Sequence, residues 1–494
     1  MQSGKSCDGV PPIPPVRRGP PSTTINQNTS DRGTGNFQNI HCEEMTVNQK
    51  IINNHNFFTN NTNGVEYVSD TGKKLEVDFT PLMSAAGKGN LDLVNKDIRS
   101  GAEVNYENRR GLTALMAAAQ NGCQPVVERL LSLGAEVNHQ DQIGFTALLL
   151  AVQNDHLGVV DRLIKHGANV NHREKRGFTA LMIATQNGLL KVVKELLKYG
   201  ADIDHQNQDG FTGLMSASQQ GHLDVVALLL KLGALVNLAD QNGSTSLMSA
   251  AMNGHFGAVD KLIKFGAEVN SANQRGFTAL LVAAQNGHLV AVFRLISSGA
   301  HVNHQDQVGF TALMIAGQNG HVDVVEGLMQ CDVDVNLQEK RGFTALMIAT
   351  QNGHLKVVQV LLENGAYVNR QNKNGSTALV IGSQNGHRNV VRKLLEVGAH
   401  VDHQNQDGFT ALMSASWNGH IGVVEELLKH GPKVNHQDKN GNTALAYAAW
   451  RGHISVVKHL VSNGAIPNKK PVNIAHLKGH KEVEYYLISL SRAQ

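Results

Sequence analysis

The stretch EKRGFTALMIATQNG occupies residues 174–188 and occurs again, unchanged, at residues 339–353. The two copies lie 165 residues apart, which is five times 33. At steps of 33 residues, with no insertion or deletion, a glycine recurs at Gly111, Gly144, Gly177, Gly210, Gly243, Gly276, Gly309, Gly342, Gly375, Gly408 and Gly441. A fixed period of this length indicates one supersecondary unit that is stacked many times along the chain.

Each unit predicts two short helices and a loop, as the one that starts at Gly342 illustrates. The hydroxyl group of Thr344 can cap a helix over residues 345–351, and Gly353 can end it in the left-handed conformation. Apolar residues then follow at helical spacing between 357 and 362, and turn-forming residues complete the unit. Because one helix pair cannot bury its apolar surface alone, neighbouring pairs must stack and share a continuous core.

The register of the repeats divides the chain into three parts. Residues 78–473 hold twelve units, of which the first starts at Asp78. The register breaks after Asn468, so residues 474–494 are predicted to form a shortened closing helix pair. Residues 1–77 are rich in Asn, Thr, Ser, Gly and Pro and lack periodicity, which is typical of a disordered tail.

Composition excludes several classes of protein. The 494 residues carry a net charge of only +3, and the four cysteines show neither disulfide nor metal spacing. No apolar segment near the first residue resembles a signal peptide, and none is long enough to span a membrane. We therefore expect an intracellular protein that is not secreted, in the cytoplasm or alternatively in the nucleus.

Four motifs of the unit resemble the ankyrin repeat: Gly-x-Thr-x-Leu, Asn-Gly-His, Val-Val-x-x-Leu-Leu and Gly-Ala-x-Val-Asn. The resemblance extends from residue 78 to the end of the chain. It implies an all-α solenoid of stacked helix-turn-helix units with projecting hairpin-like loops. The chain departs from the family because its usual motif is Thr-Ala-Leu-Met where the family has Thr-Pro-Leu-His. The proline of the family motif is present only in the first unit, as Pro81. Without that histidine, its hydrogen bonds near the loop are absent, so the resemblance no longer implies a rigid loop.

An aromatic row follows the repeat glycine. The row consists of Phe145, Phe178, Phe211, Phe277, Phe310, Phe343 and Phe409. In ankyrin-like repeats this slot lies at the base of the loop and faces the concave side, where the family uses it for contact. The rings are therefore candidate anchors for a partner. The alternative is that each ring packs on the adjacent loop and stabilises the stack.

Basic residues recur at the expected loop tips. They are Arg110, Lys175, Arg176, Arg275, Lys340 and Arg341. Such side chains can steer an acidic peptide or a phosphate backbone toward the protein. Acidic residues are interleaved with them, so the alternative is a solvated rim of mixed charge.

Histidines and asparagines also recur in fixed slots. The loop histidines are His139, His172, His205, His304, His403 and His436. Equivalent slots of a stack point in parallel and do not converge on one centre, so we expect no metal site. The loop asparagines are Asn138, Asn171, Asn303, Asn336, Asn369 and Asn435. The family resemblance makes them candidates for hydroxylation, and turn formation is the alternative role.

One motif lies in the proline-rich segment of the tail. Pro12, Pro15 and Arg17 fit the pattern P-x-x-P-x-R, which resembles ligands of SH3 domains. The alternative is a flexible spacer.

The sequence favours a non-enzymatic scaffold or adaptor that binds partner proteins on the concave face of the array. No catalytic or cofactor-binding motif appears, so we expect no enzyme activity, no cofactor and a monomer. Two alternatives stay open: nucleic-acid binding through the basic loop tips, and a regulatory subunit of a partner enzyme.

Overall fold

The computed structural model describes residues 67–68, 74–75 and 79–491, and this part of the chain forms 26 helices and two short strands. Strands β1 (Tyr67–Val68) and β2 (Lys74–Leu75) pair antiparallel, with Tyr67 opposite Leu75. All other elements are helices that alternate along the chain as the first and second members of thirteen pairs. The predicted all-α repeat architecture is thereby confirmed.

The first helices begin after a repeat glycine and a threonine, except that the earliest follows Thr80 without that glycine and the last is capped by Asn468. They are α2 (Pro81–Gly87), α4 (Ala114–Gln120), α6 (Ala147–Gln153), α8 (Ala180–Gln186), α10 (Gly213–Gln220), α12 (Ser246–Met252), α14 (Ala279–Gln285), α16 (Ala312–Asn319), α18 (Ala345–Gln351), α20 (Ala378–Asn385), α22 (Ala411–Asn418), α24 (Ala444–Arg451) and α26 (Lys469–Lys478).

The second helices each follow a tight turn that contains a glycine, except before the helix that starts at Leu157, where Asp155 takes the position with a φ of +57°. They are α3 (Leu91–Arg99), α5 (Gln124–Ser132), α7 (Leu157–Lys165), α9 (Leu190–Lys198), α11 (Leu223–Lys231), α13 (Phe256–Lys264), α15 (Leu289–Ser297), α17 (Val322–Met329), α19 (Leu355–Glu363), α21 (Arg388–Glu396), α23 (Ile421–Leu428), α25 (Ile454–Ser462) and α27 (Lys481–Ser491). The closing pair α26–α27 thus begins at Lys469, before the position at which the sequence predicted it to start.

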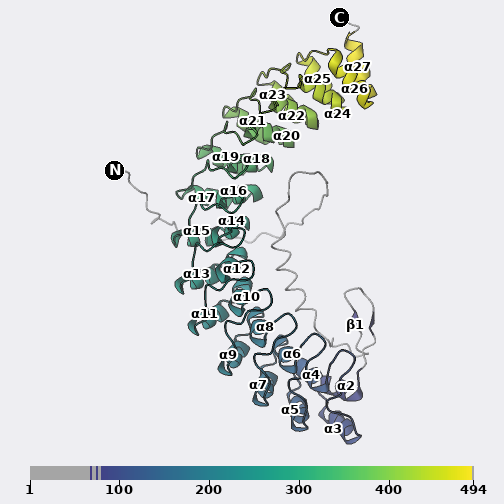
Figure 1. Ribbon diagram of the computed structural model, residues 1–494, viewed down its shortest axis with the longest axis vertical. Coiled ribbons are helices and arrows are strands. Elements are labelled where there is room, and N and C mark those ends of the chain that lie inside the picture. Colours follow the sequence, from purple (N-terminus) through teal and green to yellow (C-terminus); the bar gives the residue numbers. More distant parts are fainter. Residues whose placement is uncertain (1–66, 69–73, 76–78, 492–494) are drawn as a thin grey trace, which may run out of the picture. The chain divides into compact units, whose positions relative to one another are not determined.

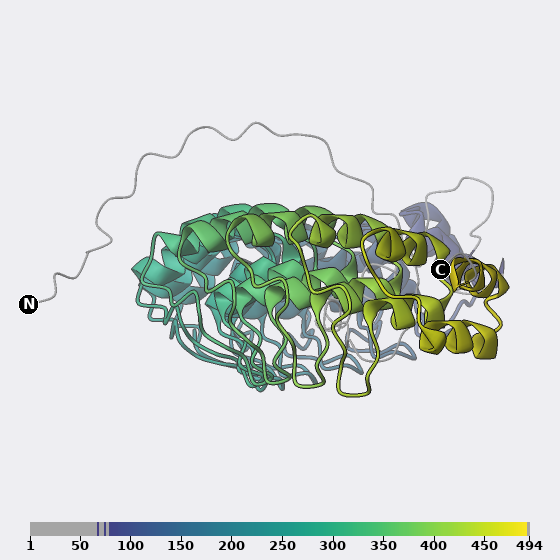
Figure 2. The same cartoon turned by 90° about the horizontal axis from the view of Figure 1, so that it is seen from above.

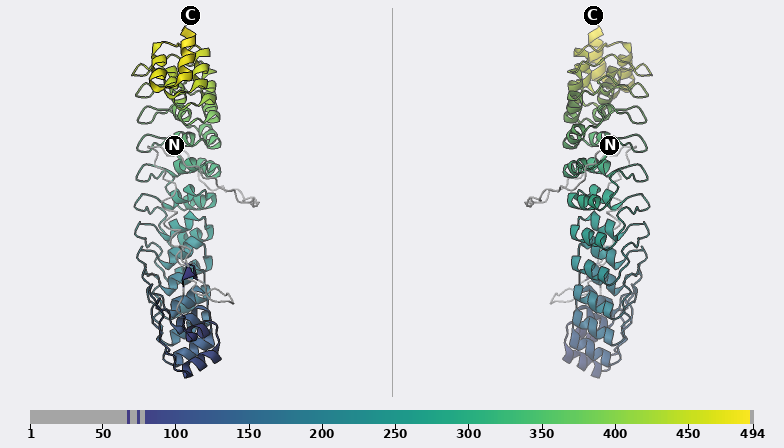
Figure 3. Two further views of the ribbon diagram at one scale, coloured as in Figure 1. Left: turned by 90° about the vertical axis from the view of Figure 1, so that its right-hand side faces the viewer. Right: turned by 90° about the vertical axis from the view of Figure 1, so that its left-hand side faces the viewer.

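The chain divides into two compact units. Among the described residues, one unit comprises those up to Ala184 together with Lys191–Asp202, and the larger unit comprises Thr185–Leu190 and those from Ile203 onward. Inside the larger unit, first helices pack against first helices and second helices against second helices, which gives two helical layers (Figure 1). The loops between successive pairs project together from one side of these layers (Figures 2 and 3).

Local sequence explains where the first helix starts and ends. The Thr344 hydroxyl accepts a hydrogen bond from the backbone N–H of Met347 at 3.3 Å, as the predicted cap requires. Met347 stands where the family has histidine, and its side chain is only 1% exposed. The predicted helix over 345–351 is α18, and Gly353 follows it with φ of +75°. The methionine slot therefore adds apolar volume to the core instead of a polar contact to the loop.

The Asn-Gly-His motif is explained by contact between neighbouring pairs. The imidazole of His387 lies directly over Gly353 of the preceding pair, where a Cβ atom would come within 2.6 Å of Nδ1. Nε2–H of the same ring donates to the carbonyl oxygen of Gln351 at 2.9 Å. Glycine is required at position 353 by both its positive φ and the approach of this ring.

The helices of the described residues are short. The longest, α27, has eleven residues, whereas a membrane-spanning helix needs about 20. In this part of the chain no helix is both long and apolar enough to cross a membrane.

Candidate protein-interaction surface

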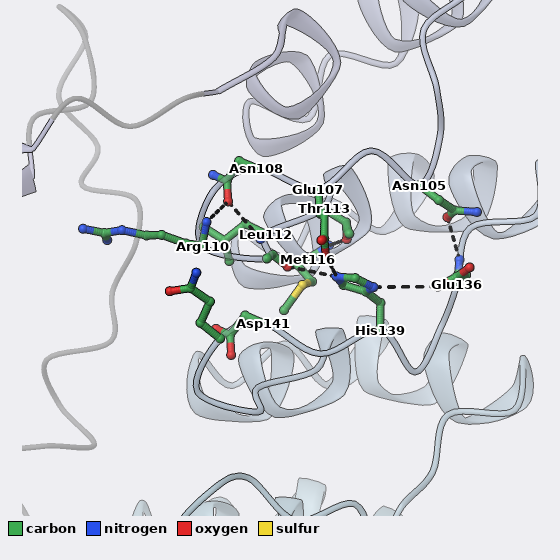
Figure 4. Close-up of polar contacts among 12 residues, drawn as sticks. Asn105, Glu107, Asn108, Arg110, Leu112, Thr113, Met116, Glu136, His139 and Asp141 are labelled. Carbon is green, nitrogen blue, oxygen red and sulfur yellow. Dashed lines mark hydrogen bonds and ion pairs between the residues drawn. The ribbon is translucent and has the colours of Figure 1, made fainter.

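Each loop tip from Asn108 to Asp438 is built on a buried or half-buried acceptor side chain. In the second copy of the repeated stretch, Oε1 of Glu339 accepts hydrogen bonds from the backbone N–H groups of Arg341 at 2.9 Å and Phe343 at 3.0 Å. Glu339 is only 3% exposed. In the first described tip, Asn108 holds Arg110 and Leu112 through its Oδ1 atom in the same way (Figure 4).

This role goes beyond the mixed-charge rim that the sequence led us to expect of the acidic tip residues. A signal for it is present in the sequence: position 339 and its equivalents carry Asn, Asp or Glu in the eleven units from residue 78 to residue 440, and all three supply a side-chain oxygen. The other acceptors are Asp141, Glu174, Asn207, Asp240, Asn273, Asp306, Asn372, Asn405 and Asp438.

Backbone hydrogen bonds connect successive tips. The N–H group of Lys340 donates to the carbonyl oxygen of Val308 at 3.0 Å, and that of Lys373 donates to Arg341 at 2.9 Å. The side chain of Gln307 adds a hydrogen bond to the carbonyl oxygen of Gln274. The tips of the larger unit are thereby held at fixed spacing by contacts that do not need the family's histidine.

The loop asparagines bridge neighbouring loops. The Asn336 amide group donates to the carbonyl oxygen of Gly365 at 3.1 Å, and its Oδ1 accepts from the backbone N–H of Tyr367 at 2.8 Å. The same two bonds are made by Asn138, Asn171, Asn303, Asn369 and Asn435. These carboxamides act between units, which adds to the turn formation considered from the sequence.

The aromatic row is buried to different degrees in the two units. Phe145 and Phe178 are 4% and 5% exposed. In the larger unit the rings are half-buried, at Phe211, Phe277, Phe310, Phe343 and Phe409. Their inner parts therefore pack in the stack while their outer edges reach solvent. This geometry is compatible with both roles that the sequence left open.

The basic tips lie beside the aromatic row in both copies of the repeated stretch. The guanidinium carbon of Arg341 is 5.2 Å from the ring centroid of Phe343, and that of Arg176 is 5.4 Å from the centroid of Phe178. Arg341 also pairs with the Glu339 carboxylate at 3.4 Å. The stretch that decides the fold thus also places a cation over an aromatic ring.

The other basic candidates differ in exposure. Lys175, Arg275 and Lys340 are exposed. Arg110 is half-buried, and its side chain points away from the turn that Asn108 forms (Figure 4). The proline-rich motif at Pro12, Pro15 and Arg17 lies outside the described residues.

The loop histidines bond to backbone carbonyl groups. Nε2 of His304 lies 2.8 Å from the carbonyl oxygen of Gly276, and His139, His172 and His403 make equivalent contacts. Each ring therefore bonds to a different unit of the stack. Within residues 67–68, 74–75 and 79–491, no three His, Cys, Asp or Glu side chains are grouped to hold a metal ion.

The histidines that follow the turn glycine precede the second helices, as His255 and His453 do. Burial lowers the pKa of His255 and of His453, which keeps both imidazoles neutral near pH 7. A neutral ring still donates through Nε2–H, as His453 does to the carbonyl oxygen of Trp417 at 3.2 Å. These side chains therefore serve the stack and not proton transfer.

Comparison with known families agrees with this geometry. A family model described as ankyrin repeats (3 copies) matches overlapping segments at residues 53–141, 126–207, 192–273, 214–306, 247–339, 280–372, 313–405 and 379–471. The chain therefore belongs to the ankyrin-repeat family, whose repeats are generally modules for protein–protein interaction. The first match starts at residue 53, upstream of the first unit at Asp78. A comparison with curated proteins gave no match.

Proposed function

We propose that the protein is a non-enzymatic interaction scaffold that binds partner proteins on the face formed by its first helices and loop tips. This is the face that the sequence led us to expect on the concave side. Family membership supports a role in protein–protein interaction. The two helical layers of each pair bury their apolar side chains against each other, so the solvent-facing residues of the first helices and tips are available for contact.

One observation carries the proposal: the half-buried ring of Phe343 stands beside a cation on a tip that is fixed by hydrogen bonds. The Phe343 ring lies under the Arg341 guanidinium group, and the tip is held by Glu339 and by the backbone of the next loop. Aromatic and arginine side chains on a rigid support dominate binding energy at many interfaces.

The experiment replaces Phe277, Phe310 and Phe343 by serine, the residue that the chain itself carries in this slot at 244 and 376. Partner proteins would be captured with the full chain, identified, purified and titrated against the wild type and the variant. We expect binding to weaken by about tenfold or more, since buried aromatic anchors contribute about 1–2 kcal/mol or more each. Helical content and cooperative melting should stay close to the wild type.

Two outcomes contradict the proposal. If melting collapses in the serine variant, the rings serve packing alone. If the purified partner binds the variant as tightly as the wild type, the aromatic row is not the contact surface.

A further inference from the structure

The last three first helices carry apolar residues in a slot that holds glutamine in every other pair of the larger unit except one, which has Met252. In the larger unit this slot, at the end of each first helix, holds Gln219, Met252, Gln285, Gln318, Gln351 and Gln384. In α22, α24 and α26 it holds Trp417, Trp450 and Leu477. The two tryptophans are the only ones in the chain.

Core packing does not require an apolar residue in this slot, because the central pairs place partly exposed glutamines there. Trp450 is 38% exposed and Leu477 is 80% exposed, whereas the core side chains of the same helices are almost completely buried. The ring centroids of Trp417 and Trp450 are 6.1 Å apart, and Trp417 also contacts Tyr447 edge-on at 5.4 Å. The three residues define an exposed apolar strip, which we call the Trp–Leu strip.

Cations cover the tryptophan rings of the strip. The guanidinium carbon of Arg451 lies 5.2 Å from the ring centroid of Trp417, and the Nζ atom of Lys478 lies 4.4 Å from that of Trp450. Each cation follows a strip residue in sequence and reaches back to the ring of the preceding pair. Among the described residues no carboxylate lies within 4.0 Å of either cation.

The surrounding segment is positively charged throughout. Residues 439–481 contain seven Lys and Arg residues and no Asp or Glu: Lys439, Arg451, Lys458, Lys469, Lys470, Lys478 and Lys481. The whole chain is nearly balanced, with 44 basic and 41 acidic residues, so this segment concentrates the positive charge. The nearest carboxylates are engaged: Asp438 accepts the Tyr447 hydroxyl, and Glu482 and Glu484 pair with Lys458 and His476.

We propose that the Trp–Leu strip binds an acidic peptide segment that carries an apolar side chain. Carboxylates of the peptide pair with Arg451 and Lys478, while the apolar side chain covers Leu477 and the exposed edge of Trp450. Charge complementarity selects this occupant. A single-stranded nucleic acid would need free ring faces on which to stack its bases, and the cations occupy those faces. This inference rests on the proposed scaffold function and assigns one class of partner to one end of the array.

The two tryptophans make intrinsic fluorescence a probe of this strip alone. The full chain would be titrated with a short peptide of Glu, Asp and Leu that lacks aromatic residues. A second peptide has Lys in place of each acidic residue, and a third has Ser in place of each Leu. We expect a saturable fluorescence change with the first peptide and at least tenfold weaker binding of the other two.

Variants locate the binding. Leu477→Gln introduces the usual residue of the slot, and the double variant Arg451→Glu with Lys478→Glu reverses the local charge. Both changes should weaken binding of the acidic peptide by about tenfold or more. The matched control is Lys231→Glu with Lys356→Glu, an equal change of charge on exposed residues of the second helices, which should leave binding unchanged. Circular dichroism checks that each variant is folded.

Three results would overturn the inference: no saturable change with the acidic peptide, equal binding of the lysine peptide, or preferential binding of an oligothymidylate. If captured partners still depend on Phe277, Phe310 and Phe343 in that case, the scaffold function stands and only this assignment fails. If the acidic peptide binds but partner capture does not depend on Phe277, Phe310 and Phe343, the aromatic row is not the partner-binding surface. The assignment of the Trp–Leu strip then stands.

Discussion

The central helix pairs of the larger unit and its last three pairs stack in the same way but fill their solvent-facing slots differently. In both regions a glycine lies under the histidine of the next pair, as Gly353 lies under His387 and Gly419 under His453. At the end of the first helix, however, the central pairs place Gln318 or Gln351 where the last pairs place tryptophan or leucine.

This difference separates two kinds of position. Slots that touch the next unit carry one residue type because each copy meets nearly the same neighbour. Slots that face solvent are free of this requirement and can differ between the two regions. Residues that contact the next unit therefore determine the stability of the stack, and residues that face solvent determine which partner is bound.

The largest effect is expected where the shared packing slot is broken in the central region. Gly353→Ala adds a Cβ atom 2.6 Å from the His387 ring at a φ of +75°. It should lower the local free energy of unfolding by about 3 kcal/mol, because both backbone strain and displacement of the ring contribute. Hydrogen exchange of the amides of α18 and α19 measures this loss.

Gly365→Ala is the matched control. Its φ is +87°, but a Cβ atom there meets nothing within 4 Å. Backbone strain alone should cost about 1 kcal/mol. Equal losses in the two variants would show that the histidine contact does not constrain Gly353.

An intermediate effect is expected at Glu426, a buried carboxylate of the last region. It accepts hydrogen bonds from Arg392 at 3.2 Å and Lys429 at 3.3 Å, and the bond from Arg392 is the main cause that lowers the pKa of Glu426 below its ordinary value of 4.5. Because the folded pKa is depressed, this stabilisation is present above pH 4.5 and is lost as the pH falls through the folded value.

Glu426→Gln should therefore destabilise the protein by about 2 kcal/mol at pH 7 and by much less below the folded pKa. Urea unfolding of the variant and the wild type at pH 7 and in acid gives the difference. Glu363→Gln, at an exposed position of the central region, should change neither value. A loss at Glu426 that persists in acid would rule out the charge interaction as its source.

The smallest effect is expected from exchanging asparagine and aspartate in the loop slot. Asn336→Asp keeps the acceptor for Tyr367 N–H but removes the donor to Gly365, and should cost about 1 kcal/mol or less. Asp402 occupies the same loop slot in the last region and accepts a hydrogen bond from the Lys433 N–H at 2.7 Å. Asp402→Asn adds the side-chain N–H donor that the aspartate lacks. Thermal unfolding should show shifts of opposite sign, and shifts of the same sign would contradict the bridging role.

Much of the fold was predictable because it depends on local interactions. The 33-residue period, the Thr344 cap and the spacing of Val357, Val358 and Leu361 lie within one unit, and the structure confirms α18 and α19 where the sequence placed them. The Phe slot and the basic tips were located from the same period. Whether those rings bind or only pack stays a prediction.

The sequence by itself determined the repeat unit, its two helices and the family to which the chain belongs, because caps, turns and helical spacing act over a few neighbouring residues. Only the tertiary structure decided what those units do to one another. It buried Glu339 as the acceptor of its turn, directed Asn336 to the next loop, and placed Arg451 and Lys478 over two tryptophans. The turn at Glu339 is local, but the other contacts join residues of different repeat units, so they depend on how the pairs stack, which the pattern within one unit does not specify.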